Sequence, residues 1–166
     1  HMRTSDPSIY AVGDAVQVRE FVSGTDAVIS LAGPANRQGR IAADNICGIP
    51  SEYRGSQGSS VIKVFDMTVA TTGLNEKTAK AAGIDYDKVY TYSASHATYY
   101  PGARNMSVKT LFERGTGRIL GAQIVGYEGT DKRSDVIATA IRAGGDYRLL
   151  EELDLAYAPP YSSAKD

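Results

Sequence analysis

Near the start of the chain lies the stretch Thr4-Ser5-Asp6-Pro7-Ser8-Ile9-Tyr10-Ala11-Val12-Gly13-Asp14, and the interpretation of the other segments depends on it. Proline has no N–H to donate within a sheet, so a strand can start after Pro7 but cannot run through it. The apolar run after it predicts a short buried strand, Ile9 to Val12. Ligands of open α/β sheets bind outside the carboxyl ends of strands. Asp14 is therefore a candidate acceptor for ligand hydroxyls; the alternative is an ordinary Gly-Asp turn.

Two short extended runs and a helix are expected next. Residues 15–21 and 27–31 alternate apolar and polar side chains around a tight turn at 23–26, which predicts a small hairpin. A helix then runs from Pro34, as its first residue, to Ile46 and ends at Gly48. Its expected buried face is Ala35, Ile41, Ala42 and Ile46.

The start of this helix is a second candidate ligand contact. Unpaired N–H groups and the helix dipole favour an anion or an electron-rich ring there. Asn36 and Arg37 lie in the first turn, and Arg40 follows one turn later. The alternative for the two arginines is an ordinary solvated helix face.

Residues 51–59 are rich in glycine and serine and predict a linker between two domains, 3–50 and 60–166. The second domain is predicted to be α+β, an antiparallel sheet with helices on one face. Its expected strands are 60–70, 88–93, 105–113 and 119–125, and its expected helices are 76–82, 131–143 and 148–153. The uncovered sheet face is available for a partner, which suggests a dimer.

Composition excludes several classes of protein. A net charge of −1 over 166 residues gives no general attraction to nucleic acid or to anionic membranes. No apolar run is long enough to span a membrane, and no signal peptide follows His1-Met2, which we interpret as a vector remnant. The chain has one cysteine, Cys47, which excludes an internal disulfide and fits a reducing cytoplasm. Because one cysteine and two distant histidines are too few ligands for zinc, we expect no metal site. We expect Cys47 to be buried and unreactive, because the C-terminal end of a helix raises a thiol pKa.

Tyrosine is unusually frequent, with eleven residues against three phenylalanines and no tryptophan. Two clusters, residues 96–102 and 157–165, combine tyrosine, proline and serine with few aliphatic side chains. Such segments present hydroxyls and ring faces to a ligand or another subunit; packing in a core or interface is the alternative. His96 has no carboxylate partner nearby in sequence, so we interpret it as a structural loop residue.

These motifs together resemble one family. The pattern Thr4-x-x-Pro7-x-Ile9-Tyr10-Ala11-x-Gly13-Asp14 resembles the second flavin-binding motif of the flavoprotein disulfide reductases, and the helix from Ala35 resembles the one that follows it there. Residues from about 56 onward resemble the C-terminal dimerisation domain of that family. The tail Tyr157-Ala-Pro-Pro-Tyr161-Ser-Ser-Ala-Lys165-Asp166 is most similar to the coenzyme A-disulfide reductase and NADH oxidase branch.

The resemblance implies a role for particular residues. Asp14 would accept from the ribityl chain of FAD, and the helix at Pro34 would face the flavin ring. The other residues implied to form the FAD site are Thr4, Pro7, Ile9, Tyr10, Ala11, Gly13 and Tyr157. Tyr99 and Tyr157 would be catalytic hydroxyls near the redox centre of the partner subunit. Coenzyme A would contact Asn36, Arg37, Arg40, Tyr161 and Lys165.

Several parts of such an enzyme are absent from this sequence: the first FAD fingerprint, the NAD(P)H fingerprint and the redox cysteine. We therefore expect a C-terminal piece of an FAD-dependent NAD(P)H:disulfide oxidoreductase, inactive by itself and empty of FAD. It would supply the homodimer contact and part of the site for FAD and a coenzyme A-type disulfide or persulfide. The parent could instead be an NADH oxidase or a persulfide or polysulfide reductase. A non-catalytic dimerisation or interaction module is the alternative from another class.

Overall fold

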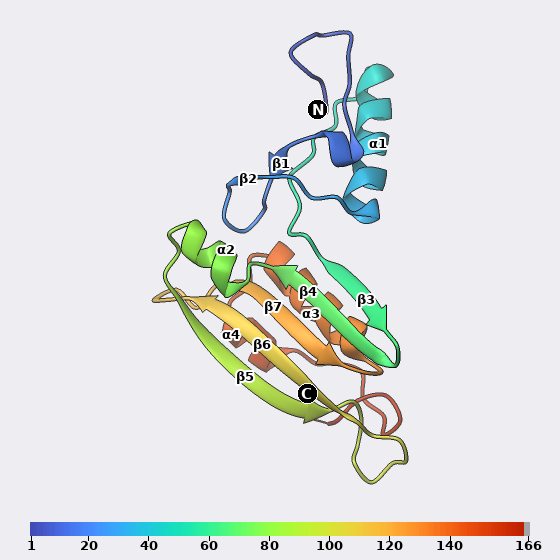
Figure 1. Ribbon diagram of the computed structural model, residues 1–166, viewed down its shortest axis with the longest axis vertical. Helices are drawn as coiled ribbons and strands as arrows, with labels where there is room; N and C mark the ends of the chain where they lie inside the picture. The colour runs from blue at the N-terminus through green and yellow to red at the C-terminus, as the bar shows by residue number, and fades with distance from the viewer. Residues whose placement is uncertain (165–166) are drawn as a thin grey trace. The chain divides into compact units, whose positions relative to one another are not determined.

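The computed structural model describes residues 1–164 (Figure 1). The chain forms two compact units, residues 1–58 and 59–166, each with its own set of contacts. No helix in the described residues is long and apolar enough to cross a lipid bilayer.

The first unit is small and built around one helix. A short 3₁₀ helix, η1 (Gly13–Ala15), is followed by the two-residue strands β1 (Val18–Arg19) and β2 (Asp26–Ala27), which pair antiparallel as the expected hairpin. Helix α1 (Ala32–Ile46) then ends at Gly48, whose φ of +80° is the left-handed conformation that suits a glycine after a helix.

The predicted strand from Ile9 to Val12 is wrong. Residues 2–11 fold back on themselves instead: the N–H of Thr4 donates to the carbonyl of Ile9 at 2.9 Å, and that of Ala11 to the carbonyl of Met2 at 3.0 Å. Ile9 is 53% exposed and Val12 is 39% exposed. A buried parallel strand needs a neighbouring strand on the sheet, and no described strand pairs with this segment.

Three expectations about α1 also need correction. The helix starts two residues earlier than predicted, so Pro34 is its third residue. Proline is still tolerated there, because the first four N–H groups of a helix have no partner within the helix. Ile46 is 65% exposed, while the polar Gln38 is buried with Ile41 and Ala42. Cys47, expected to be buried, is exposed. Gln38 takes the buried place because its side-chain oxygen accepts the N–H of Gly13 at 2.7 Å.

The second unit is an antiparallel five-stranded sheet in the order β3-β4-β7-β6-β5. This confirms the predicted α+β class. The strands are β3 (Ser60–Val64), β4 (Met67–Gly73), β5 (Tyr86–Ala94), β6 (Asn105–Glu113) and β7 (Ile119–Gly126), and the helices are α2 (Glu76–Ala81), α3 (Thr130–Arg142) and α4 (Tyr147–Glu152). The single strand predicted over residues 60–70 is wrong, because the chain reverses at Phe65-Asp66 and makes a hairpin of β3 and β4.

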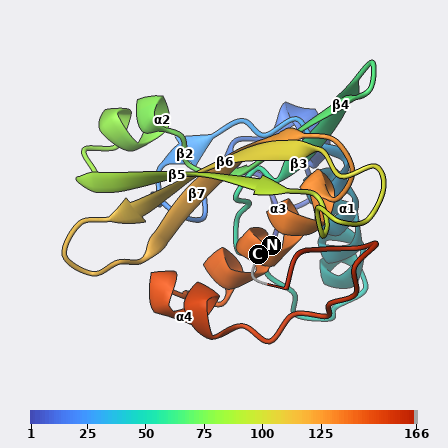
Figure 2. The same cartoon turned by 90° about the horizontal axis from the view of Figure 1, so that it is seen from below.

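The two faces of the sheet differ. Helix α3 packs across β4 and β7 and, with α4, lies on one face; α2 lies on the other side near one end (Figure 2). The core between sheet and helices holds Ala70, Leu120, Ala122, Ile124, Ile137 and Ile141, all less than 9% exposed. Opposite α3, an open face presents exposed apolar and aromatic side chains: Ile62, Val64, Met67, Val125, Tyr90 and Tyr92.

Candidate functional site

The two tyrosines predicted to be catalytic meet in the structure. Tyr99 lies in the loop between β5 and β6, residues 95–104, and Tyr157 lies in the tail after α4. Their hydroxyl oxygens are 3.1 Å apart, although the residues are 58 positions apart in sequence. Both rings are exposed, Tyr99 by 76% and Tyr157 by 47%. The structure therefore places two phenolic hydroxyls side by side at the surface of the second unit.

The hydrogen bond between the pair changes the acidity of Tyr157. The bond to Tyr99, together with partial desolvation, raises the pKa of the Tyr157 hydroxyl above its ordinary value. A phenol with a raised pKa keeps its proton near neutral pH and can donate it in a hydrogen bond. The arrangement suits the stabilisation of a nearby anion.

A main-chain contact joins the loop to the tail, and two further contacts shape the tail. The N–H of Ala97 donates to the carbonyl of Pro159 at 3.2 Å. In the tail, the N–H of Tyr161 donates to the carbonyl of Ala158 at 2.9 Å, and the buried Ser162 hydroxyl donates to the carbonyl of Ala156 at 3.4 Å. The tail, rich in tyrosine, proline and serine, thus forms a turn that leaves Tyr157 at the surface. It does not pack into a core.

A cavity of about 460 Å³ lies beside Tyr157. Its lining includes Tyr157 and Tyr161 from the tail, His96 from the loop, and Glu128 and Lys132 near the start of α3. Sequence reasoning did not select Glu128 or Lys132 as site residues. Only the packing of α3 against the sheet brings them next to the tail, so no local motif could have identified them.

In the first unit, three of the expected flavin-contacting residues, Gly13, Asp14 and Pro34, lie at the start of α1. A Cβ built on Gly13 would lie 4.0 Å from the Cβ of Ala35, so the Gly13-Asp14 pair lies beside the first turn of the helix. Asp14 is exposed. Leu31 precedes the helix and provides no side-chain cap, and the first turn has no acidic residue. The first N–H groups of α1 can therefore donate hydrogen bonds to an electron-rich group of a ligand.

The other predicted FAD residues, Thr4, Pro7, Ile9, Tyr10 and Ala11, occupy the folded-back segment, where the Tyr10 hydroxyl accepts from the Arg3 guanidinium at 2.8 Å. Of the predicted coenzyme A residues, Asn36, Arg37 and Arg40 are exposed on α1, and Tyr161 is 71% exposed beside the cavity. Lys165 lies outside the described residues. Residues 1–164 contain no group of three or more histidine, cysteine, aspartate or glutamate residues able to hold a metal ion.

Comparison with known proteins identifies the relatives of the chain. It is 35% identical to the coenzyme A disulfide reductase of Staphylococcus epidermidis over its whole length, but it spans only 38% of that protein. The crystal structure of reduced Bacillus anthracis CoADR-RHD superimposes with a TM-score of 0.96 at 55% identity, over 99% of this chain and 30% of that one. The NAD-dependent persulfide reductase of A. fulgidus gives the same TM-score at 46% identity, over 99% and 31% of the two chains.

The family profile of the pyridine nucleotide-disulphide oxidoreductase dimerisation domain matches residues 59–166, well over half of the chain. That segment coincides with the second unit, which carries the sheet, the open face and the tyrosine pair. The chain therefore belongs to the family of pyridine nucleotide-disulphide oxidoreductase dimerisation domains.

Proposed function

We propose that this chain is the C-terminal part of an FAD-dependent, NAD(P)H-using disulfide reductase of the coenzyme A-disulfide type. In that enzyme it would supply the homodimer contact, one wall of the FAD site and the tyrosine hydroxyls near the reacting sulfurs. The observation that carries the proposal is the contact between the hydroxyls of Tyr99 and Tyr157, 3.1 Å apart. The names of the relatives support the substrate class, and the single cysteine supports a reducing, cytoplasmic location.

The tyrosine pair would act on the sulfur that leaves. When a disulfide is cleaved by a thiolate, the electron pair of the S–S bond goes to the departing sulfur. The Tyr157 hydroxyl, which like any phenol is protonated near neutral pH, would donate a hydrogen bond to that sulfur. Tyr99 would hold the Tyr157 hydroxyl in place. Lys132 and the phenol of Tyr161, which line the same cavity, would contact polar groups of the substrate.

The residues of the first unit fit a flavin. When bound, FAD would carry electrons between NAD(P)H and the disulfide. Asp14 is exposed and would accept from a ribityl hydroxyl, while the uncapped start of α1, with Pro34 in its first turn, would face the electron-rich edge of the ring. The exposed Asn36, Arg37 and Arg40 would contact coenzyme A phosphates, together with Tyr161 and Lys165.

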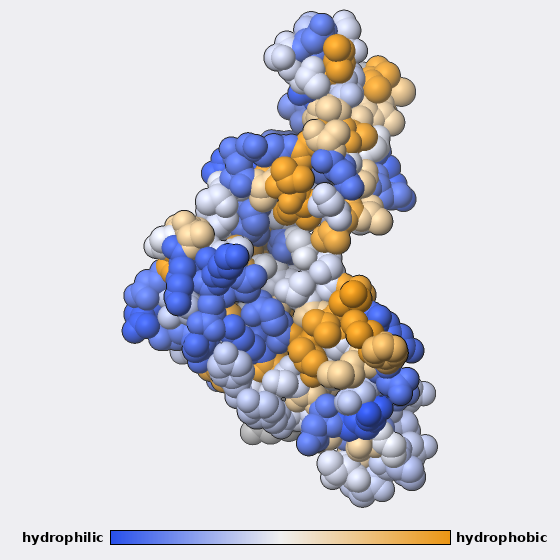
Figure 3. Space-filling model, in the orientation of Figure 1, coloured by the Kyte–Doolittle hydropathy of each residue, from blue (hydrophilic) through white to orange (hydrophobic). Residues whose placement is uncertain are grey.

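Dimerisation would use the open sheet face. Figure 3 shows apolar side chains gathered over β3 and β4 on the side away from α3. Ile62, Met67 and Val125 are 59%, 40% and 38% exposed, and burial against a second copy would remove this surface from water. The family match supports a dimer of this domain.

The test of the catalytic proposal uses the full-length, FAD-loaded enzyme that contains this chain. Changing Tyr99 and Tyr157 together to phenylalanine should lower kcat for coenzyme A disulfide at least tenfold, as expected for the loss of a hydrogen-bond donor that stabilises the departing thiolate. FAD content should be unchanged. Tyr147→Phe, on α4 and outside both the cavity and the open face, is the matched control. Unchanged turnover in the double variant would contradict the proposal.

A second candidate function is persulfide or polysulfide reduction, favoured by the 46% identity to a protein named as a persulfide reductase. Oxygen reduction by an NADH oxidase would use the same flavin. Turnover of the full-length enzyme with coenzyme A disulfide, a coenzyme A persulfide and oxygen distinguishes the three. A purified chain that dimerises but binds neither FAD nor coenzyme A would instead behave as a dimerisation module.

A further inference from the structure

We propose that His96 is a positioning residue: its ring ties together the two sides of the 95–104 loop and so holds the Tyr99 hydroxyl against Tyr157. The inference rests on the proposed function of the tyrosine pair, and it assigns His96 no contact with the substrate. The following observations carry it.

The imidazole of His96 bridges the loop from within. The side chain is 5% exposed, with Nδ1 lying 3.1 Å from the Ser95 hydroxyl and Nε2 lying 3.2 Å from the carbonyl oxygen of Pro101. A carbonyl oxygen can only accept, so Nε2 carries the proton and donates. A neutral ring with its proton on Nε2 can accept from the Ser95 hydroxyl at Nδ1.

Ser95 extends this bridge to the base of the loop. The hydroxyl oxygen of Ser95 accepts the N–H of Arg104 at 3.2 Å, and the backbone N–H of Ser95 donates to the carbonyl of Arg104 at 2.9 Å. The Ser95 carbonyl accepts from the Arg133 guanidinium of α3 at 3.0 Å. The base of the loop is thus held on the helix-covered side of the sheet. The hydrogen bond from His96 links this base to Pro101 on the other side of the loop.

Tyr99 itself has little packing to hold it. Its ring is 76% exposed, and it lies between two residues that are held: Ala97, whose N–H donates to the tail at Pro159, and Tyr100, whose N–H donates to Ala97 at 2.9 Å. The ring of Tyr100 meets the His96 ring edge-on, with centroids 5.9 Å apart. The direction of the Tyr99 side chain is therefore set by the backbone that His96 restrains.

A displacement of about 1 Å in a reacting group is enough to cost a large part of a rate. A buried ring that fixes this backbone therefore has a consequence for the reaction beyond the stability of the loop. A merely structural histidine would change stability without changing the tyrosine pair.

The first measurement needs no catalysis. In the 166-residue chain with 13Cζ-labelled tyrosine, the titration of Tyr157 is followed by NMR and identified with Tyr157→Phe. In the wild type, the hydrogen bond to Tyr99 raises the pKa of Tyr157. Tyr99→Phe should return it toward the ordinary value, and His96→Leu should lower it in the same way. An unchanged Tyr157 pKa in folded His96→Leu overturns the proposal.

The second measurement is turnover by the full-length enzyme. His96→Leu should lower kcat about as far as Tyr99→Phe does, with KM unchanged, and the two changes combined should lower it no further, because both act through one hydroxyl. His96→Gln, whose amide N–H can still reach the Pro101 carbonyl, should recover part of the loss. Additive losses in the double variant would contradict the proposal.

Two further outcomes keep the tests separate. If His96→Leu does not fold, Ser95→Ala, which removes the hydroxyl from Nδ1 and from the Arg104 N–H, should lower the Tyr157 pKa in the same direction, and no change in it overturns the proposal. If Tyr99→Phe leaves turnover unchanged while His96→Leu still shifts the titration, the positioning holds and the proposed catalytic function fails.

Discussion

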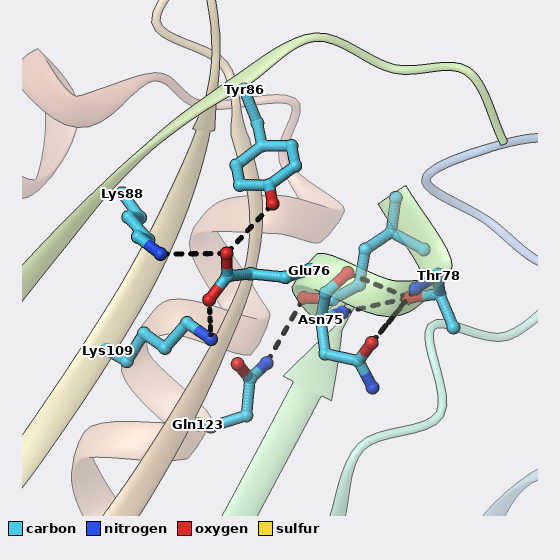
Figure 4. A network of polar contacts seen from close by, with 8 residues as sticks. Asn75, Glu76, Thr78, Tyr86, Lys88, Lys109 and Gln123 are labelled. Carbon is cyan, nitrogen blue, oxygen red and sulfur yellow. Dashed lines mark hydrogen bonds and ion pairs between the residues drawn. The ribbon is translucent and has the colours of Figure 1, made fainter. Parts of the chain in front are cut away.

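At the scale of single residues, Glu76 illustrates a contact that only the fold creates. Its carboxylate receives the Lys88 ammonium at 2.8 Å, the Lys109 ammonium at 2.6 Å and the Tyr86 hydroxyl at 2.9 Å (Figure 4). These residues come from α2, β5 and β6, so the network fastens the helix to the sheet. The hydrogen bonds from Lys109, Lys88 and Tyr86, in that order, lower the pKa of Glu76 to about 2.

This pKa makes the stability of the second unit depend on pH. A carboxylate whose pKa is lower in the folded than in the unfolded chain stabilises the fold above the unfolded pKa and loses that contribution as pH falls. Between the ordinary value of 4.5 and about 2, the wild type should lose stability that Glu76→Gln lacks at every pH. We expect Glu76→Gln to lower the urea midpoint at pH 7, and the difference from the wild type to shrink toward pH 2.

The control for this measurement is Glu151→Gln, an exposed acidic residue of α4 that forms no ion pair with a described residue. It should leave the urea midpoint near that of the wild type at both pH values. A difference between wild type and Glu76→Gln that stays constant from pH 7 to pH 2 would contradict the assignment.

At the scale of elements, the β3–β4 hairpin contains a strained turn. Phe65 has a φ of +52° and is 95% exposed at the tip. A bulky residue in the left-handed region costs roughly 1–2 kcal/mol, whereas asparagine adopts it readily. Phe65→Asn should therefore raise the free energy of unfolding by about 1 kcal/mol. Urea unfolding monitored by circular dichroism measures this change.

Phe65→Ala is the matched control for the turn, because it removes the ring without relieving the backbone. It should leave the stability of the monomeric chain nearly unchanged. A gain in Phe65→Ala equal to that in Phe65→Asn would show that the exposed ring, and not the backbone, is the source of the strain.

The centre of the sheet depends on a glycine for a different reason. A Cβ on Gly121 of β7 would collide with the main chain of Leu74 and with the Thr72 carbonyl. Since these are backbone atoms, no side-chain movement can make room. Gly121→Ala should cost about 1–3 kcal/mol in urea unfolding. The same exchange at Gly39, where nothing lies within 4 Å of an added Cβ, should not destabilise the chain, and equal losses at both sites would refute this reason.

At the scale of the whole molecule, the two units differ in their capacity to fold alone. The first has only four buried apolar side chains, Val18, Val22, Ile41 and Ala42, whereas the second has a continuous core under its sheet. A piece of about 60 residues buries little surface and is marginal even with a good core. We expect residues 59–166 to give a dispersed NMR spectrum alone, and residues 1–58 to give the spectrum of an unfolded chain.

The open sheet face gives a prediction at the same scale. The chain should sediment as a dimer at micromolar concentration, and Val125→Glu should shift it to monomer because a carboxylate would be buried without a partner. Thr139→Glu, on the exposed side of α3, is the control and should remain dimeric. A wild-type monomer at micromolar concentration would exclude this face as a tight self-contact.

The sequence alone determined the elements whose signals are local. The helix expected over 76–82 is confirmed as α2, and its start has a capping box in which the Asn75 side chain accepts the N–H of Thr78 at 2.9 Å. The 105–113 strand was predicted to the residue. The relationship to the disulfide reductases was also readable from the sequence, because its motifs are contiguous.

Tertiary structure decided what depends on distant neighbours. Residues 9–12 are apolar enough for a strand, but without a pairing neighbour they fold back on residues 2–4. Likewise, only the packing of loop against tail sets Tyr99 beside Tyr157, since a hydrogen bond between residues 58 positions apart has no local signature.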